Sequence, residues 1–256
     1  MKTKSLLAKL SKRFPKRFAK MNHDYVGLMA GKIPEEVHKI LLCLDFDEEV
    51  FFHAKEFKPD LIITHHPFIY GKKSFVLAND NIKKELFDKV ESNNMCIYSM
   101  HTNFDTGNGG MNDALASKLG LINIYTPLKD PMMRIGYLRD SMKIEEFCKK
   151  AKHDFEVEYG LLVKGNDKLI HKVGIIGGGG SRSLNIARDE GCDIFISGDA
   201  PHHVRRECIN TGMNYFDMPH EIEKIFMPTM KDLLLGYDNT LDVLIVDHEK
   251  TPTVIL

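Results

Sequence analysis

This 256-residue sequence lacks three features that often indicate a protein's class: a long apolar run, a cysteine pairing pattern and a strong net charge. No apolar run approaches the ~20 residues that a membrane span needs. The five cysteines are widely spaced, with no C-x-x-C and no pairing pattern, and the net charge is only -1. A chain so near neutrality has no global field that favours nucleic acid or an anionic membrane, and such cysteines are typical of buried thiols in a reducing compartment. We therefore expect a cytoplasmic protein that binds neither membrane nor nucleic acid.

The first twenty residues are strongly basic. They hold eight Lys or Arg and no acid. Apolar side chains recur there at near-helical spacing: Leu6, Leu7, Leu10, Phe14 and Phe18. A transit peptide or a membrane-surface helix would also fit this pattern, but a signal peptide would need a continuous apolar core. We favour an amphipathic helix that packs on the domain, keeps a solvated basic face and breaks near Pro15.

Beyond residue 26 the pattern alternates between apolar strands and helices of about ten residues. In the first half we expect strands over 26–31, 40–46, 61–64 and 95–100, and helices over 48–56, 81–91 and 111–119. In the second half we expect strands over 135–138, 156–163, 169–176, 192–197 and 213–218, and helices over 143–152, from 204, and over 221–235. This order indicates βαβ units. We expect an α/β protein of two similar lobes with mainly parallel sheets, residues 1–125 and 126–256, with the C-terminal helix packing back on the first lobe.

Ligand-type side chains follow several of these strands. Leu61–Thr64 is an apolar run typical of a buried parallel strand. Six residues stand at or just after strand ends: His65 and His66, His101 and Asp105, and His220 with Glu223. The carboxyl ends of strands are where open α/β sheets bind ligands. Imidazole and carboxylate suit Zn, Fe, Mn or Ni, and such a set can hold two ions.

Each of these residues also has a purely structural interpretation. Asp105 could cap a turn, His101 could be a core histidine, and Glu223 could complement a helix N-terminus. Their recurrence at strand ends favours metal binding instead. Spacing then separates two acids: residues three apart on a helix share a face, so Glu223 can reach an ion bound by His220, whereas Glu221 should point away.

Two further stretches are harder to interpret. Gly177–Gly180 precedes an expected helix and could cradle phosphate through backbone N–H groups. It lacks the Lys-Ser/Thr of a P-loop, so we favour a structural turn, with phosphate binding as the alternative. His202 and His203 follow the strand over 192–197, and the sequence assigns them no role.

Three blocks of this sequence resemble the family of GTP cyclohydrolase I type 2 homologues, also called the Ngg-interacting-factor-three-like family. They are Leu61-Ile-Ile-Thr-His-His-Pro-Phe68, Ser99-Met-His-Thr-Asn-Phe-Asp105, and Ile196-Ser-Gly-Asp199 with His202-His203. The resemblance extends over most of the chain, from Val26 to the helix after His220. It implies two α/β lobes with a di-metal site in the cleft between them, assembled as a homohexamer.

Carried over by position, the resemblance also implies the ligands of two divalent transition-metal ions. They would be His65, His66, Asp105, His220 and an acid after His220, which we take to be Glu223. His101 would face the substrate or orient a ligand, and we assign it a catalytic, proton-transferring role. The sequence departs from the family at Pro219, where a glycine is usual, and at position 224, where a lysine replaces the usual acid.

Together these features predict a metal-dependent hydrolase of cyclohydrolase or phosphoesterase type. Its substrate would be a small nucleotide or another phosphate-bearing molecule. The alternative is a non-catalytic metal-binding scaffold or an interaction protein. The sequence does not decide between an enzyme and a binding protein.

Overall fold

The computed structural model describes residues 1–249 and 252–255. These residues form two compact units, one of residues 1–110 with 226–249 and one built around residues 111–225. Each unit contains one β-sheet with helices packed on it. The expected α/β class is therefore confirmed, whereas the lobe boundary expected at residue 125 stays a prediction.

The first sheet has the strand order β1-β4-β3-β2-β11. These strands are β1 (Gly27–Ala30), β4 (Ile97–Ser99), β3 (Leu61–Thr64), β2 (Lys39–Cys43) and β11 (Asp242–Ile245). The last four run parallel, and β1 pairs antiparallel with β4. Every residue of β3 is buried, because a parallel strand covered on both faces is apolar throughout.

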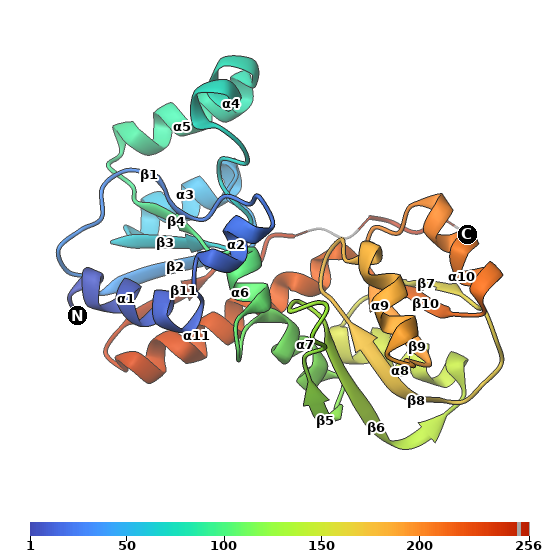
Figure 1. The fold of residues 1–256 in the computed structure, drawn as a ribbon. Helices are drawn as coiled ribbons and strands as arrows, with labels where there is room; N and C mark the ends of the chain where they lie inside the picture. The colour runs from blue at the N-terminus through green and yellow to red at the C-terminus, as the bar shows by residue number, and fades with distance from the viewer. Residues whose placement is uncertain (250–251, 256) are drawn as a thin grey trace. The chain divides into compact units, whose positions relative to one another are not determined.

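Helices cover both faces of this sheet. They are α1 (Thr3–Arg13), α2 (Arg17–Met21), α3 (Glu48–Phe57), α4 (Lys73–Asn79), α5 (Asn81–Ser92), α6 (Thr102–Thr106) and α11 (Phe226–Tyr237). Figure 1 shows α3 and α5 on one side of the sheet, and α1 and α11 on the other. The amphipathic first helix is confirmed: α1 buries Leu6, Leu7 and Leu10, and the chain breaks around Pro15 before α2 begins.

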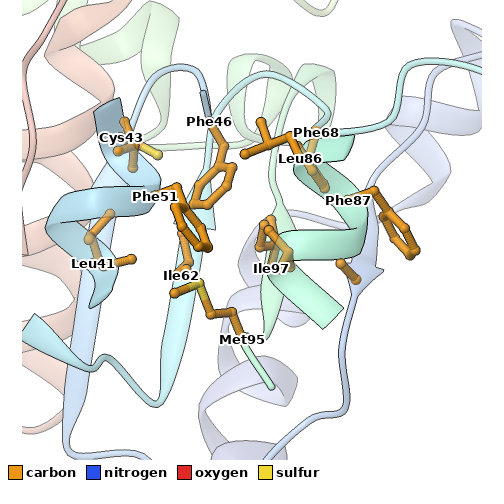
Figure 2. Packing of buried hydrophobic residues seen from close by; sticks show 14 of the residues in the cluster. Leu41, Cys43, Phe46, Phe51, Ile62, Phe68, Leu86, Phe87, Met95 and Ile97 are labelled. Atoms are coloured by element: carbon orange, nitrogen blue, oxygen red, sulfur yellow. The ribbon is translucent and has the colours of Figure 1, made fainter. Parts of the chain in front are cut away.

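One core cluster ties three neighbouring strands to α3 and α5. Leu41, Ile62 and Ile97 occupy one face of β2, β3 and β4 and contact Phe51 of α3 and Phe87 of α5 through the cluster seen in Figure 2. Burying each such side chain contributes ~1.5–3 kcal/mol. This packing, together with the parallel ladder, fixes where the three strands end.

The second sheet has the order β5-β6-β8-β9-β10-β7. Its strands are β5 (Ile122–Tyr125), β6 (Arg134–Met142), β7 (Leu161–Val163), β8 (Ile170–Ile175), β9 (Ile194–Ser197) and β10 (Asn214–Asp217). Only the β8-β9 and β9-β10 pairs are parallel. The sheet is therefore mixed rather than mainly parallel, partly because the segment 126–133 between β5 and β6 is too short for a parallel crossover.

The second unit adds four helices and two 3-10 turns. They are α7 (Met111–Lys118), α8 (Ile144–Phe155), α9 (Leu184–Asp189), α10 (His202–Thr211), η1 (Ser181–Ser183) and η2 (His220–Ile225). Residues of α9 and α10 share one buried cluster with Phe195 and Tyr215 of the sheet. The single helix expected over 221–235 is instead the turn η2 followed by α11.

Membrane-spanning and disulfide features are absent from the described part of the chain. Within residues 1–249 and 252–255, no helix is long and apolar enough to cross a bilayer. All five cysteines are buried thiols that form no disulfide.

Candidate metal centre

The parallel register of the first sheet brings three strand ends side by side. Cys43 pairs with Thr64, and Thr64 pairs with Ser99, so β2, β3 and β4 end at one level. Backbone hydrogen bonds continue one step further: the His65 N–H donates to the Cys43 carbonyl at 3.2 Å. The segments that follow the three strands therefore leave the same edge of the sheet.

Three histidines meet at that edge. The ligand-type nitrogens of His65, His66 and His101 all lie within 4.8 Å of one another. The ring centroid of His65 is 5.1 Å from those of both His66 and His101. His65 is fully buried, and the other two are partly exposed. The structure thus brings together three of the residues that the sequence selected.

Asp105 joins them from the short helix α6. Its Oδ1 lies 3.5 Å from Nε2 of His65, and its side chain is 6% exposed. The sequence analysis expected no helix here, but the chain turns into one directly after His101, where the Phe104 N–H donates to the His101 carbonyl at 2.7 Å. The ring of Phe104 packs on Phe14 and Phe226, which anchors the turn. We call His65, His66, His101 and Asp105 the first donor set.

Each imidazole of this set is oriented by an oxygen at its Nδ1. His65 Nδ1 lies 2.9 Å from the Met100 carbonyl, His66 Nδ1 lies 2.7 Å from Asp45, and His101 Nδ1 lies 2.9 Å from Asp24. Carbonyls and carboxylates only accept, so Nδ1 carries the hydrogen in each ring. A neutral imidazole in this tautomer has its lone pair on Nε2, the form in which histidine binds a metal ion.

Asp24 is the most heavily bonded of these acceptors. Its Oδ2 accepts from His101 and also from the hydroxyl of Thr102 at 2.5 Å, and its Oδ1 accepts from the Tyr25 N–H at 2.7 Å. Burial raises the pKa of Asp24, but the hydrogen bonds and charge of His101 and the bonds from Thr102 and Tyr25 together lower it below its usual value. The carboxylate therefore stays ionised and holds the His101 ring.

The second unit carries its own pair of ligand-type residues, His220 and Glu223, which we call the second donor set. Both lie in the turn η2, directly after β10. Nε2 of His220 is 3.1 Å from Oε2 of Glu223, whose side chain is 5% exposed. A 3-10 turn has three residues per turn, so residues three apart lie one above the other. The expected pairing of His220 with Glu223 is present in the geometry, whereas their role as ligands stays a prediction.

The surroundings of His220 attract positive charge. Nδ1 of His220 is 2.5 Å from Oδ2 of Asp199, which follows the neighbouring strand β9. The hydrogen bonds that His220 donates to Glu223 and Asp199, together with the charges of these two carboxylates, outweigh burial and raise the pKa of His220 to about 9. The two carboxylates therefore favour a positive charge at the imidazole of His220.

The glycine-rich loop 177–180 packs closely against this pair. A Cβ at Gly178 would lie 2.3 Å from Oε1 of Glu223, and Gly178 has a positive φ of 60°. The loop therefore needs glycine so that the Glu223 carboxylate can approach its backbone. A carboxylate at this position would repel a phosphate group, which supports the interpretation as a structural turn.

His202 and His203 belong to neither donor set. They are the first two residues of α10, and both side chains are exposed. Among the described residues, no group of metal-binding geometry includes either of them.

Reasoning from the sequence missed the three carboxylates that orient the histidines: Asp24, Asp45 and Asp199. Two of them carried a usable signal, because Asp45 and Asp199 each follow a strand that neighbours a histidine-bearing strand. Asp24 carried none, since it lies before the sheet begins and 77 residues from His101. Such partners orient ligands and are commonly as important as the ligands.

The donors present fit a divalent transition-metal ion. Imidazoles in the tautomer that leaves Nε2 for coordination, combined with buried carboxylates and no thiolate, suit Zn, Fe, Mn or Ni. A buried carboxylate such as Asp105 or Glu223 is also costly unless a cation compensates its charge.

Comparison with known proteins identifies similar chains. The family model described as Duf34/NIF3 (NGG1p interacting factor 3) matches residues 1–252. A GTP cyclohydrolase 1 type 2 homolog of Clostridium perfringens is 31% identical over 207 residues, covering 78% of this chain and 79% of that protein. A protein of the same name from Lactococcus lactis is 29% identical over 242 residues, covering 93% of both chains.

Solved structures show the same fold. The Bacillus cereus protein related to NIF3 has a TM-score of 0.88 at 20% identity, and it covers 100% of this chain and 99% of its own. The Staphylococcus aureus protein SA1388 also has a TM-score of 0.88, at 25% identity and with the same coverage.

The first donor set predicts a large difference between two histidine variants. His66→Ala should lower the affinity for Zn²⁺ or Mn²⁺ by roughly 100-fold or more, because it removes a ligand rather than an orienting partner. The matched control is His53→Ala, an exposed histidine on α3 outside both donor sets. Metal analysis after reconstitution measures the effect, and equal retention in the two variants would exclude His66 as a ligand.

The second donor set predicts a difference between Glu221 and Glu223, two glutamates of the same turn. Glu223→Gln should lower the metal content, because an amide is a weaker ligand than a carboxylate. Glu221→Gln should leave it unchanged, since Glu221 lies one position away in η2 and is not paired with His220. Loss of metal from both variants, or from neither, would contradict the assignment of Glu223.

Proposed function

The chain belongs to the Duf34/NIF3 family, and on this premise we propose that it is a metal-dependent hydrolase of a small nucleotide or phosphate-bearing substrate. The observation that carries the proposal is the arrangement of the first donor set. Three imidazoles have Nδ1 held by oxygen atoms, and their ligand-type nitrogens converge beside a buried carboxylate. Buried histidines of a structural core are hydrogen-bonded too, so it is the convergence of three ring nitrogens beside a carboxylate that favours metal binding.

Residues of both donor sets would hold two divalent ions, with His65, His66, Asp105, His220 and Glu223 as ligands. That both sets serve one centre is a prediction from the family resemblance. Divalent ions bound by such residues lower the pKa of a coordinated water and polarise the group under attack. The protein's contribution is to hold the ligands in place through Asp45, Asp199 and the Met100 carbonyl.

His101 is the residue we assign to proton transfer. Asp24 accepts from its Nδ1, which keeps Nε2 as the basic nitrogen and stabilises the imidazolium once a proton arrives. The imidazole is partly exposed, with 22% of its side-chain surface accessible, so a substrate can reach it. The buried His65, by comparison, is suited only to ligation.

The relatives support the reaction class and the substrate. Several curated relatives carry the name GTP cyclohydrolase 1 type 2 homolog, which favours hydrolysis and a purine nucleotide. The test is a hydrolysis screen of the metal-loaded protein against GTP, other nucleotides and phosphoesters. Failure to turn over any of them, with metal bound, would favour the non-catalytic metal-binding protein.

Proton transfer by His101 predicts that two properties separate in a His101→Gln variant. The variant should keep its metal content and lose roughly 10²–10⁴-fold in turnover, the usual contribution of a general acid or base. The measurement combines metal analysis with the rate on whichever nucleotide the screen selects. A parallel loss of metal would instead make His101 a ligand, which its position among the His65 and His66 nitrogens also permits.

We also propose a cytoplasmic homohexamer, as the family resemblance implies. The five reduced, buried thiols support a reducing compartment. Light scattering should give six times the 29.2 kDa mass of one chain at micromolar concentration. A monomeric mass would remove the hexamer from the proposal without affecting the metal assignments.

A further inference from the structure

A pocket of about 380 Å³ opens in the first unit beside the first donor set. Its size lies within the ~300–1,000 Å³ that small-molecule sites occupy. Two chain segments form it, one around α2 and β1 and one leading into α4. Its lining residues are Lys16, Ala19, Lys20, Asp24, Tyr25, Val26, Leu28, Met29, Ile69, Gly71, Lys72 and Lys73.

Four lysines face this pocket from the two segments: Lys16, Lys20, Lys72 and Lys73. Within the described residues, no ion pair joins any of them to a carboxylate. Aromatic rings support two of them, since the Lys16 amine lies 5.3 Å from the centroid of Tyr98 and the Lys73 amine lies 4.0 Å from that of Phe87. Four cations gathered without counter-charges repel one another, so an anion that enters the pocket gains their combined attraction.

The one acid in the lining, Asp24, offsets only part of this charge. Asp24 is 3% exposed, and its oxygens accept hydrogen bonds from His101, Thr102 and Tyr25. In the described part of the chain, its oxygens therefore bind the His101 ring and its neighbours and pair with none of the four lysines. The same bonds join the wall of the pocket to the residue we assign to proton transfer.

The remainder of the lining is apolar and includes one aromatic ring. Val26, Leu28, Met29 and Ile69 provide an apolar wall, and Tyr25 stands at its edge with 41% of its surface exposed. The ring of Tyr25 meets that of Tyr70 edge-on, with centroids 5.9 Å apart. Flat heterocycles stack on such surfaces, whereas inorganic phosphate has no apolar surface that could contact them.

We propose that this pocket is the substrate site and that it binds a 5′-mononucleotide, with the phosphate on the four lysines and the base against the apolar wall and Tyr25. This proposal rests on the proposed function in one respect only, namely that the nucleotide bound in the pocket is the substrate of the hydrolase. The binding itself depends on the cations and the apolar wall, neither of which belongs to a donor set.

Calorimetry on the full metal-loaded chain tests both halves of the site. The probes are guanosine 5′-monophosphate, guanosine, ribose 5-phosphate and inorganic phosphate. The nucleotide should bind at least roughly tenfold more tightly than any of its parts, because it alone uses the lysines and the wall together. Its affinity should also fall as salt is raised.

Two double variants that remove the same charge distinguish specific binding in the pocket from non-specific attraction of an anion to a basic surface. Lys72→Ala with Lys73→Ala should weaken nucleotide binding roughly tenfold or more. Lys4→Ala with Lys12→Ala, which removes two exposed lysines of α1 outside the pocket, should leave it within about twofold. Equal weakening by the two pairs, no binding of nucleotide at millimolar concentration, or equal affinity for phosphate and nucleotide would each overturn the proposal.

The outcome is distinguishable from that of the metal proposal. The lysine variants should keep their full metal content, and His66→Ala should still bind the nucleotide after it has lost metal. Nucleotide binding without turnover by the metal-loaded protein would leave the pocket standing and reject the hydrolase. Turnover that is unchanged in the Lys72→Ala, Lys73→Ala double variant would leave the hydrolase standing and reject the pocket as its substrate site.

Discussion

Parallel hydrogen bonding among β2, β3 and β4 is the constraint on which the first donor set depends. Each strand is held to its neighbour in register, and the ladder continues past the strands through the Met100 N–H, which donates to the Thr64 carbonyl at 2.9 Å. The backbone of the donor segment is thus part of the sheet's own bonding. Donors on rigid elements lose little conformational entropy when they bind, which is how a protein makes a precise site.

The same principle operates in the second unit. There β8, β9 and β10 run parallel, and their ends carry Gly178, Asp199 and His220. The Gly198 N–H donates to the Gly178 carbonyl at 2.7 Å, and the Met218 N–H donates to the Ser197 carbonyl at 2.9 Å. Each unit therefore uses adjacent parallel strands to place an imidazole beside a carboxylate that orients it, His66 beside Asp45 in the first unit and His220 beside Asp199 in the second.

The predictability of each feature follows from how local its cause is. The strand β3 and its His65-His66-Pro67 ending were predicted to the residue, because a short apolar run and a proline act within a few positions. The helix α6 was missed, since its five residues are stabilised by the packing of Phe104 on distant rings rather than by propensity. The strand β11 was missed for a similar reason: it is set by pairing with β2, about 200 residues earlier.

Asp24 shows most clearly what a sequence cannot supply, and it also links the two proposed sites. One of its oxygens accepts from His101 and Thr102, and the other accepts from the backbone of Tyr25 in the pocket wall. Because the backbone of Tyr25 and the His101 ring are bonded to the same carboxylate, the wall of the pocket and the first donor set share one residue. Asp24 and His101 are 77 residues apart, so no local pattern could reveal this connection, and only the folded structure does.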